Sequence, residues 1–135
     1  MFFRLSVFFI LVIALSACVE PPFSDVDNEM LKQMLEQGVP IYDVRRPEEW
    51  QQTGVIKGSQ LLTFEDADGN VLPDFLSRFT RNVGKEDAVI LIGSNGSRTS
   101  TLALYLAQQM GYTHVYNAGN GISKWISDGR PVIHL

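Results

Sequence analysis

The stretch that decides the fold is Ala88-Val89-Ile90-Leu91-Ile92-Gly93-Ser94-Asn95-Gly96-Ser97-Arg98-Thr99. Residues 88–92 are apolar throughout, which is typical of a central strand in a parallel sheet that is covered on both faces. The glycines and short polar side chains that follow predict a tight loop, and residues 98–110 predict a helix with Leu102 and Leu106 on its apolar face. A strand, a glycine loop and a helix in this order present backbone amides and a helix N-terminus, an arrangement that suits an anion.

The segments on either side alternate between strand and helix patterns. Strands are predicted at residues 39–44, 59–64 and 115–117, and helices at residues 28–37, 47–54, 72–79 and 121–127. Apolar residues make up 45% of the chain and charged residues 19%, a balance that allows one hydrophobic core. We therefore expect an α/β fold in one domain over residues 28–135, with a parallel sheet flanked by helices on both faces.

Three further blocks, read together with the loop, resemble the rhodanese superfamily over roughly residues 39–132. Residues 41–50 resemble the family's "Asp-Val-Arg" block and the acidic-aromatic pair after it, and residues 54–59 resemble its "Gly-His-Ile-x-Gly-Ala" block, with Val55 in place of the histidine. Residues 117–132 resemble the closing "Gly-Gly-x-x-x-Trp … Gly-x-Pro-Val" block. The resemblance implies a rhodanese-like sheet, and it implies that Asp43 and Arg45 support the active-site loop by ion pairing.

The loop departs from the family pattern at its most important position. Active members have Cys-x-x-Gly-x-Arg-Ser there, and alignment of the glycine and arginine with Gly96 and Arg98 places Gly93 at the cysteine. Sulfur transfer needs a thiolate that carries a persulfide, and glycine has no side chain to provide one. We therefore expect no catalytic residue in the family's sense. The alternative is a sulfurtransferase-type or phosphatase-type enzyme that uses another loop residue, with Ser94 the nearest candidate, but a hydroxyl is a weak nucleophile without an adjacent base.

The loop keeps features that could bind a small oxyanion. The predicted anion-binding loop consists of Gly93, Ser94, Asn95, Gly96, Ser97 and Arg98. Its backbone amides, the helix dipole and the arginine side chain all favour negative charge. An equally weighted alternative is that Arg98 only braces the loop against Asp43 or Glu48. A third alternative is that the loop binds no ligand and that the domain is kept for packing or assembly.

The N-terminus is predicted to be an export signal. Residues 5–17 are mostly apolar and follow Arg4, but they are too short for a stable membrane span. Leu15-Ser16-Ala17-Cys18 resembles the lipobox of bacterial lipoproteins, in which the cysteine receives diacylglycerol. We expect a signal peptide over residues 1–17, a lipidated Cys18 with a tether over residues 18–27, and, because Val19 follows the cysteine, attachment to the outer membrane facing the periplasm.

The composition of the chain excludes several classes of binding partner. The formal net charge is −4 for the whole chain, and no lysine or arginine cluster exceeds Arg45-Arg46, so nucleic acid is not an expected partner. The single cysteine excludes an intrachain disulfide and a cysteine-cluster metal site. We expect no metal and no cofactor. The expected partners are a small oxyanion, a membrane through the lipid, and an envelope protein, while the oligomeric state is left open.

Overall fold

The computed structural model describes residues 20–135. The predicted signal peptide and Cys18 lie outside the described residues. Within residues 20–135, no helix is both long enough and apolar enough to cross a membrane.

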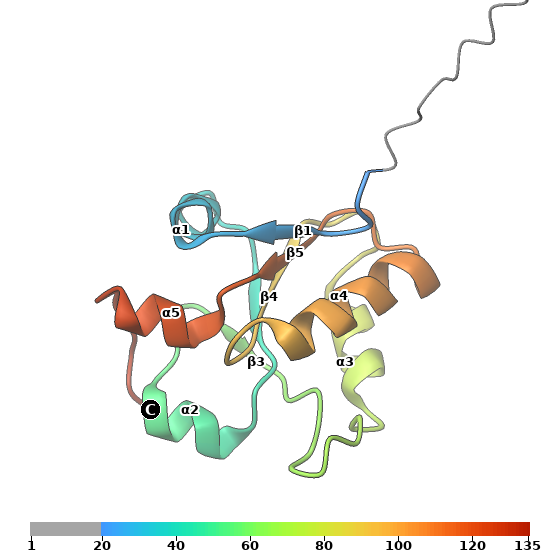
Figure 1. The fold of residues 1–135 in the computed structure, drawn as a ribbon. Coiled ribbons are helices and arrows are strands. Elements are labelled where there is room, and N and C mark those ends of the chain that lie inside the picture. The colour runs from blue at the N-terminus through green and yellow to red at the C-terminus, as the bar shows by residue number, and fades with distance from the viewer. Residues whose placement is uncertain (1–19) are drawn as a thin grey trace, which may run out of the picture.

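Five parallel strands form a single sheet at the centre of the domain (Figure 1). The strands are β1 (Ser24–Val26), β2 (Ile41–Asp43), β3 (Gln60–Leu61), β4 (Val89–Ile92) and β5 (Val115–Ala118). Their order across the sheet is β1-β5-β4-β2-β3, and every pair of neighbours runs parallel. The most apolar strand, β4, therefore lies in the middle, as its composition predicts, and the α/β fold is confirmed.

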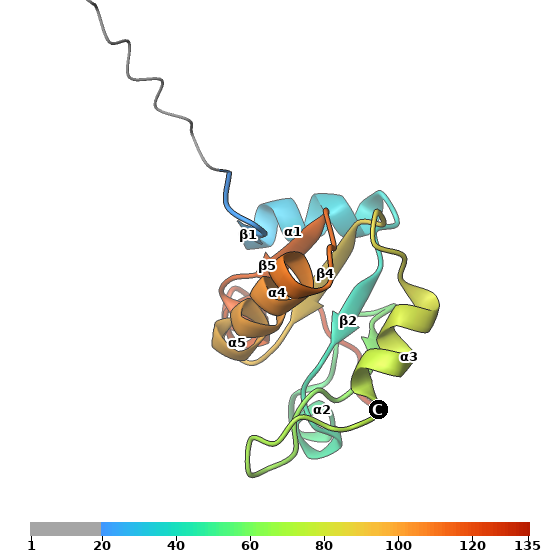
Figure 2. The same cartoon turned by 90° about the vertical axis from the view of Figure 1, so that its right-hand side faces the viewer.

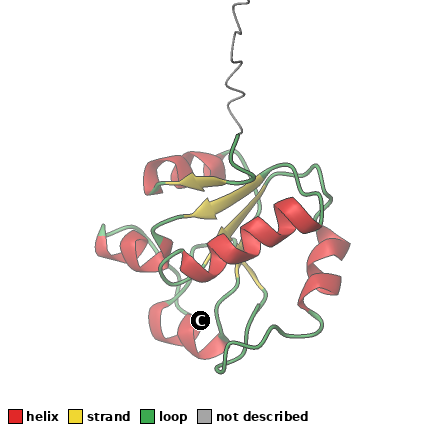
Figure 3. Cartoon of the chain, turned by 45° about the vertical axis from the view of Figure 1, so that its right-hand side comes forward, coloured by secondary structure: helices red, strands yellow, loops and turns green. Residues whose placement is uncertain are grey.

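Residues 20–135 contain five helices, and four of them cover the two faces of the sheet (Figures 2 and 3). The five helices are α1 (Asn28–Glu36), α2 (Pro47–Thr53), α3 (Phe75–Asn82), α4 (Ser97–Gln109) and α5 (Gly121–Ser127). Successive side chains of a strand point to opposite faces, so Val89 and Leu91 pack with α3 and α4 while Ile90 and Ile92 pack with α1 and α5. Helices on both faces of the sheet are therefore confirmed.

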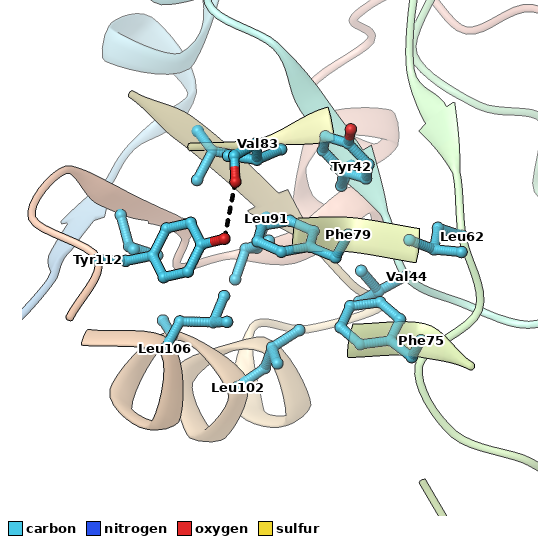
Figure 4. Close-up of a cluster of buried hydrophobic side chains, with 13 residues drawn as sticks. Tyr42, Val44, Leu62, Phe75, Phe79, Val83, Leu91, Leu102, Leu106 and Tyr112 are labelled. Atoms are coloured by element: carbon cyan, nitrogen blue, oxygen red, sulfur yellow. Dashed lines mark hydrogen bonds between the residues drawn. The ribbon is translucent and has the colours of Figure 1, made fainter. Parts of the chain in front are cut away.

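The core on the α3–α4 face is rich in aromatic rings (Figure 4). Phe75 and Phe79 are stacked with their ring centroids 5.8 Å apart, and Tyr42 meets Phe79 edge-on at 5.1 Å. The hydroxyl of Tyr112 donates a 2.7 Å hydrogen bond to the carbonyl oxygen of Val83, so its polar atom is satisfied inside the core. This core fixes α4, the helix that follows the candidate loop.

The predicted tether over residues 18–27 is wrong in its last part. Residues 24–26 form the edge strand β1, in which Asp25 stands opposite Asn117 of β5. The strand was missed because it is three residues long and only Val26 is buried, so no alternating pattern is visible. The folded domain therefore begins before residue 28.

Two predicted elements differ from the observed elements in their bounds: one strand is shorter, and one helix of the same length is shifted by three residues. The strand predicted at residues 59–64 is reduced to β3, although the amides of Leu62 and Phe64 still donate to carbonyls of residues 43 and 44. The helix predicted from residue 72 begins at Phe75, after the turn that contains Pro73. Both differences lie at the ends of elements, where local patterns carry the least information.

Candidate functional site

The candidate loop lies between the C-terminal end of β4 and the N-terminal end of α4, at the carboxyl edge of the sheet. The first turn of α5 packs directly against it. The amides of Ile122 and Ser123 donate to the carbonyl oxygens of Gly93 and Ser94 at 2.9 and 3.1 Å. These bonds hold the loop's carbonyl groups on the side of α5.

Two glycines make this close packing geometrically possible. Gly96 has φ +88°, and a Cβ added there would lie 2.2 Å from the carbonyl oxygen of Gly119. Gly121 has φ +65°, and a Cβ there would lie 2.3 Å from the carbonyl oxygen of Ser94. Any other residue would clash with backbone and would be strained in this left-handed conformation, so both glycines are structural requirements of the loop.

The backbone amides of the loop are largely free of protein acceptors. Among the described residues, the amides of Ser94, Asn95 and Gly96 donate to no protein atom. The amide of Ser97 is capped by Asn95 Oδ1 at 3.1 Å, and the Ser97 hydroxyl lies 2.8 Å from the same oxygen. Three successive amides at the start of a helix therefore have no protein acceptor, which is a condition for binding an anionic group there.

Arg98 has a different partner from those expected. Its Nη2 lies 3.2 and 3.5 Å from the two carboxylate oxygens of Glu49 on α2, so the predicted bracing partners Asp43 and Glu48 are wrong. The Ser94 hydroxyl donates to Glu49 Oε1 at 3.1 Å and lies 3.3 Å from Arg98 Nη2. The side-chain donors of Ser94 and Arg98 thus converge on one carboxylate.

The pKa of Glu49 is lowered by this environment. Partial burial acts to raise the pKa, but the hydrogen bond from the Arg46 amide, the charge of Arg98 and the hydrogen bond from Ser94 together outweigh it. The Arg46 amide donates to Glu49 Oε2 at 2.9 Å, which also caps the first turn of α2. Glu49 is therefore a carboxylate at neutral pH.

Asp43 and Arg45 form a buried ion pair. Their side-chain exposures are 0% and 2%, and Arg45 Nη2 lies 2.9 Å from Asp43 Oδ2. Arg45 also donates to Thr53 Oγ1 and to the Gly54 carbonyl oxygen, and Trp50 Nε1 donates to Asp43. Among the described residues the pair has no hydrogen bond to the loop itself. Its contacts fix α2, and α2 carries the glutamate that touches the loop.

The backbone at Gly93 is compatible with a side chain. Its φ is not positive, and a Cβ added there would meet only Thr99, with Cγ2 at 3.1 Å and Oγ1 at 3.8 Å. Thr99 is fully buried, and its hydroxyl donates to the Gly96 carbonyl oxygen at 3.2 Å. The methyl group of Thr99 is therefore the nearest neighbour of the space that a side chain at position 93 would enter.

Two residues that contribute to the site, Glu49 and Asn117, have no distinctive signal in the sequence. Glu49 was visible only as one of two adjacent acids after Pro47, and nothing in the pattern distinguished it from Glu48. Asn117, at the end of β5, donates from Nδ2 to the Gly96 carbonyl oxygen at 3.2 Å and to Asp25 Oδ1 at 2.9 Å. It links the loop to β1, the strand that the sequence pattern did not reveal. Within residues 20–135, no three His, Cys, Asp or Glu side chains are grouped so that they could hold a metal ion.

A family model described as the rhodanese-like domain matches residues 27–128. The chain belongs to this family. The match includes β4, the loop and α4, together with the Asp43–Arg45 pair and both glycines that the loop packing requires.

Individual relatives agree with this assignment. A curated relative from Arabidopsis thaliana, the mitochondrial protein HIGH ARSENIC CONTENT 1, is 33% identical over 106 residues, which cover 77% of this chain and 62% of the plant protein. The rhodanese-like domain of an Anabaena protein has a TM-score of 0.64 at 24% identity, covering 82% of this chain and 79% of that one. The polysulfide-sulfur transferase homodimer of Wolinella succinogenes has a TM-score of 0.65 at 17% identity, covering 84% and 80%. The two structural likenesses concern the fold alone.

Proposed function

We propose that this rhodanese-like domain does not transfer sulfur. The observation that carries the proposal is Gly93, which stands at the junction of β4 and the loop where the nucleophile would be attached. The single cysteine of the sequence, Cys18, precedes the domain and is the predicted lipid attachment site. No thiolate is then available to accept a sulfane sulfur.

We further propose that the loop binds a small oxyanion. The three free amides of residues 94–96 and the N-terminus of α4 support this proposal, because they concentrate positive potential at one point of the surface. The contact between Arg98 and Glu49 shows that the loop's side-chain donors are able to hold a carboxylate. The guanidinium that braces the loop against Glu49 is therefore also the group that an external anion would engage.

An enzyme that uses Ser94 is the second candidate, because Glu49 provides the adjacent carboxylate that the sequence did not reveal. The same contacts argue against it. The lowered pKa of Glu49 makes this carboxylate a weak base, which is poorly matched to removing a proton from a serine hydroxyl. The charge of Arg98 that lowers this pKa also holds the carboxylate in place.

One assay separates the two candidates. We expect the wild-type domain to show no thiosulfate:cyanide sulfurtransferase or aryl phosphatase turnover above an unrelated control protein, and we expect Ser94→Ala to leave that background unchanged. Turnover of thiosulfate well above the control would overturn the non-catalytic proposal. Turnover that Ser94→Ala abolishes would instead establish the serine-dependent enzyme.

We propose that the protein is exported and lipid-anchored at the bacterial outer membrane. The support is the lipobox-like sequence that ends at Cys18. Labelled palmitate is expected to enter the wild-type protein and not Cys18→Ser, and membrane fractionation is expected to release the variant into the soluble fraction. Equal labelling of both proteins would contradict the anchor.

A further inference from the structure

The side-chain donors of the loop already hold an anion that belongs to the chain itself. Glu49 Oε1 lies 3.1 Å from the Ser94 hydroxyl and 3.2 Å from Arg98 Nη2. The contact is partly shielded from solvent, with side-chain exposures of 19% for Glu49 and 34% for Arg98. A carboxylate therefore occupies the charged half of the loop, while the free amides of residues 94–96 form the other half.

From this division of donors we infer that Glu49 is an internal competitor, a carboxylate latch that an external oxyanion must displace from Arg98 and Ser94 before it can use the whole loop. The inference deepens the proposed oxyanion binding and rests on it. The expected ligand is a compact dianion such as sulfate, phosphate or thiosulfate, because its several oxygens could engage the amides and the guanidinium together.

Electrostatics supports competition rather than cooperation. An oxyanion at the free amides would share one arginine with a neighbouring carboxylate, and two like charges at such short range repel each other. Arg98 gives Glu49 one nitrogen in this arrangement, Nη2, so the contact is not the bidentate pair that would make displacement most costly. The contact between Glu49 and Arg98 should therefore lower the affinity of the loop for an external anion without preventing its binding.

The latch can release without any movement of α2. Glu49 Oε2 is held by the Arg46 amide at the start of the helix, and the buried Asp43–Arg45 pair fixes the end of the helix through Thr53 and Gly54. Release therefore needs only a rotation of the Glu49 side chain. That rotation also moves Oε2, so the hydrogen bond from the Arg46 amide is given up together with the contact to Arg98.

The test compares two neutralising substitutions at adjacent positions. Glu49→Gln removes the latch, whereas Glu48→Gln removes the same charge from an exposed side chain that contacts Arg46 and not the loop. By isothermal calorimetry with sodium sulfate at constant ionic strength, we expect Glu49→Gln to bind about fivefold to tenfold more tightly than wild type, as expected when one nearby like charge is lost at a partly exposed site. Glu48→Gln should stay within about twofold of wild type because its charge is distant and screened.

The outcomes separate the latch from the proposed function. Measurable sulfate binding with equal affinity in wild type and Glu49→Gln would overturn the latch and leave oxyanion binding intact. Absence of binding in both proteins would overturn both. Equal gains in the two variants would also overturn the latch, since they would reflect net charge alone.

Two further measurements keep the test decisive if Glu49→Gln is poorly folded. Glu49→Asp keeps the charge but shortens the side chain by one methylene, so it should loosen the contact with Arg98 and tighten sulfate binding by a smaller factor. In the wild-type protein, sulfate titration should move the NMR resonance of the Glu49 side-chain carboxyl carbon together with the amides of residues 94–96. A carboxyl resonance that stays fixed while the amides shift would contradict displacement.

Discussion

The double variant Gly93→Cys/Thr99→Ser is expected to show thiosulfate sulfurtransferase activity well above that of the wild-type protein, for which we propose none. The loop keeps the free amides, the helix N-terminus and Arg98, so the missing element is the thiolate itself. We expect a rate on the order of 10² above the wild-type background, a small part of the roughly 10⁶-fold that removal of a catalytic nucleophile can cost. A thiosulfate:cyanide assay with all variants at equal folded concentration would measure it.

Thr99→Ser is needed because of the space at position 93. A Cβ at Gly93 would lie 3.1 Å from Thr99 Cγ2, below the separation at which carbon atoms attract each other. Serine removes this methyl group and keeps the hydroxyl that donates to the Gly96 carbonyl oxygen. We therefore expect Gly93→Cys alone to be less stable than the double variant by roughly 1 kcal/mol, the low end for an overpacked site, and to be less active.

Two further variants, one single and one triple, make this prediction specific. Thr99→Ser alone should remain inactive, because it adds no thiol. Arg98→Ala in the double variant should reduce the new activity, since it removes the loop's guanidinium. If the double variant is folded, carries a titratable thiol and shows no activity above wild type, the loop has lost more than its nucleophile.

The second large effect is expected for Arg45→Met. This substitution leaves the fully buried carboxylate of Asp43 without the guanidinium that neutralises its charge. It also removes the hydrogen bonds that Arg45 donates to Thr53 and Gly54. Breaking a buried pair on one side costs about 3–5 kcal/mol in the free energy of unfolding. Urea denaturation followed by circular dichroism would measure the loss.

A surface pair provides the matched control. Lys124→Met breaks the contact between Lys124 of α5 and Asp128, the residue that follows the helix. The lysine side chain is 54% exposed, and the change should cost about 1 kcal/mol or less in the free energy of unfolding. In the variant Asp43→Asn/Arg45→Met the unpaired charge is gone, so part of the lost stability should return. A loss below about 1 kcal/mol for Arg45→Met would show that the buried pair does not hold α2 in place.

The central part of the fold could be predicted closely from sequence because burial on two faces leaves a strong signal. The predicted strand at residues 88–92 and helix at residues 98–110 correspond to β4 at Val89–Ile92 and α4 at Ser97–Gln109. The edge strand β1 could not be predicted, since its three residues bury a single side chain and its pairing with β5 joins segments about ninety residues apart. Such a long-range pairing has no local pattern.

The candidate site was predictable in its backbone and not in its side-chain partners. The glycine spacing and Arg98 located the loop, while the missing nucleophile at Gly93 stays a prediction. The bracing partner was assigned to the wrong acids, because Glu48 and Glu49 are neighbours whose directions differ by about 100° around a helix axis. The residue at which α2 begins and the rotation of the helix about its axis decide that Glu49 faces the loop. Both are determined by the packing of the helix in the folded domain.

The parallel course of the strands has a consequence for how an anchored protein would face its surroundings. The chain enters β1 at the amino edge of the sheet, and the loop leaves β4 at the opposite, carboxyl edge. Six peptide steps separate Cys18 from Ser24, a reach of about 20 Å at full extension, so lipidation would keep the amino edge close to the bilayer. The loop would then be turned away from the lipid headgroups, toward solutes that diffuse in the open compartment.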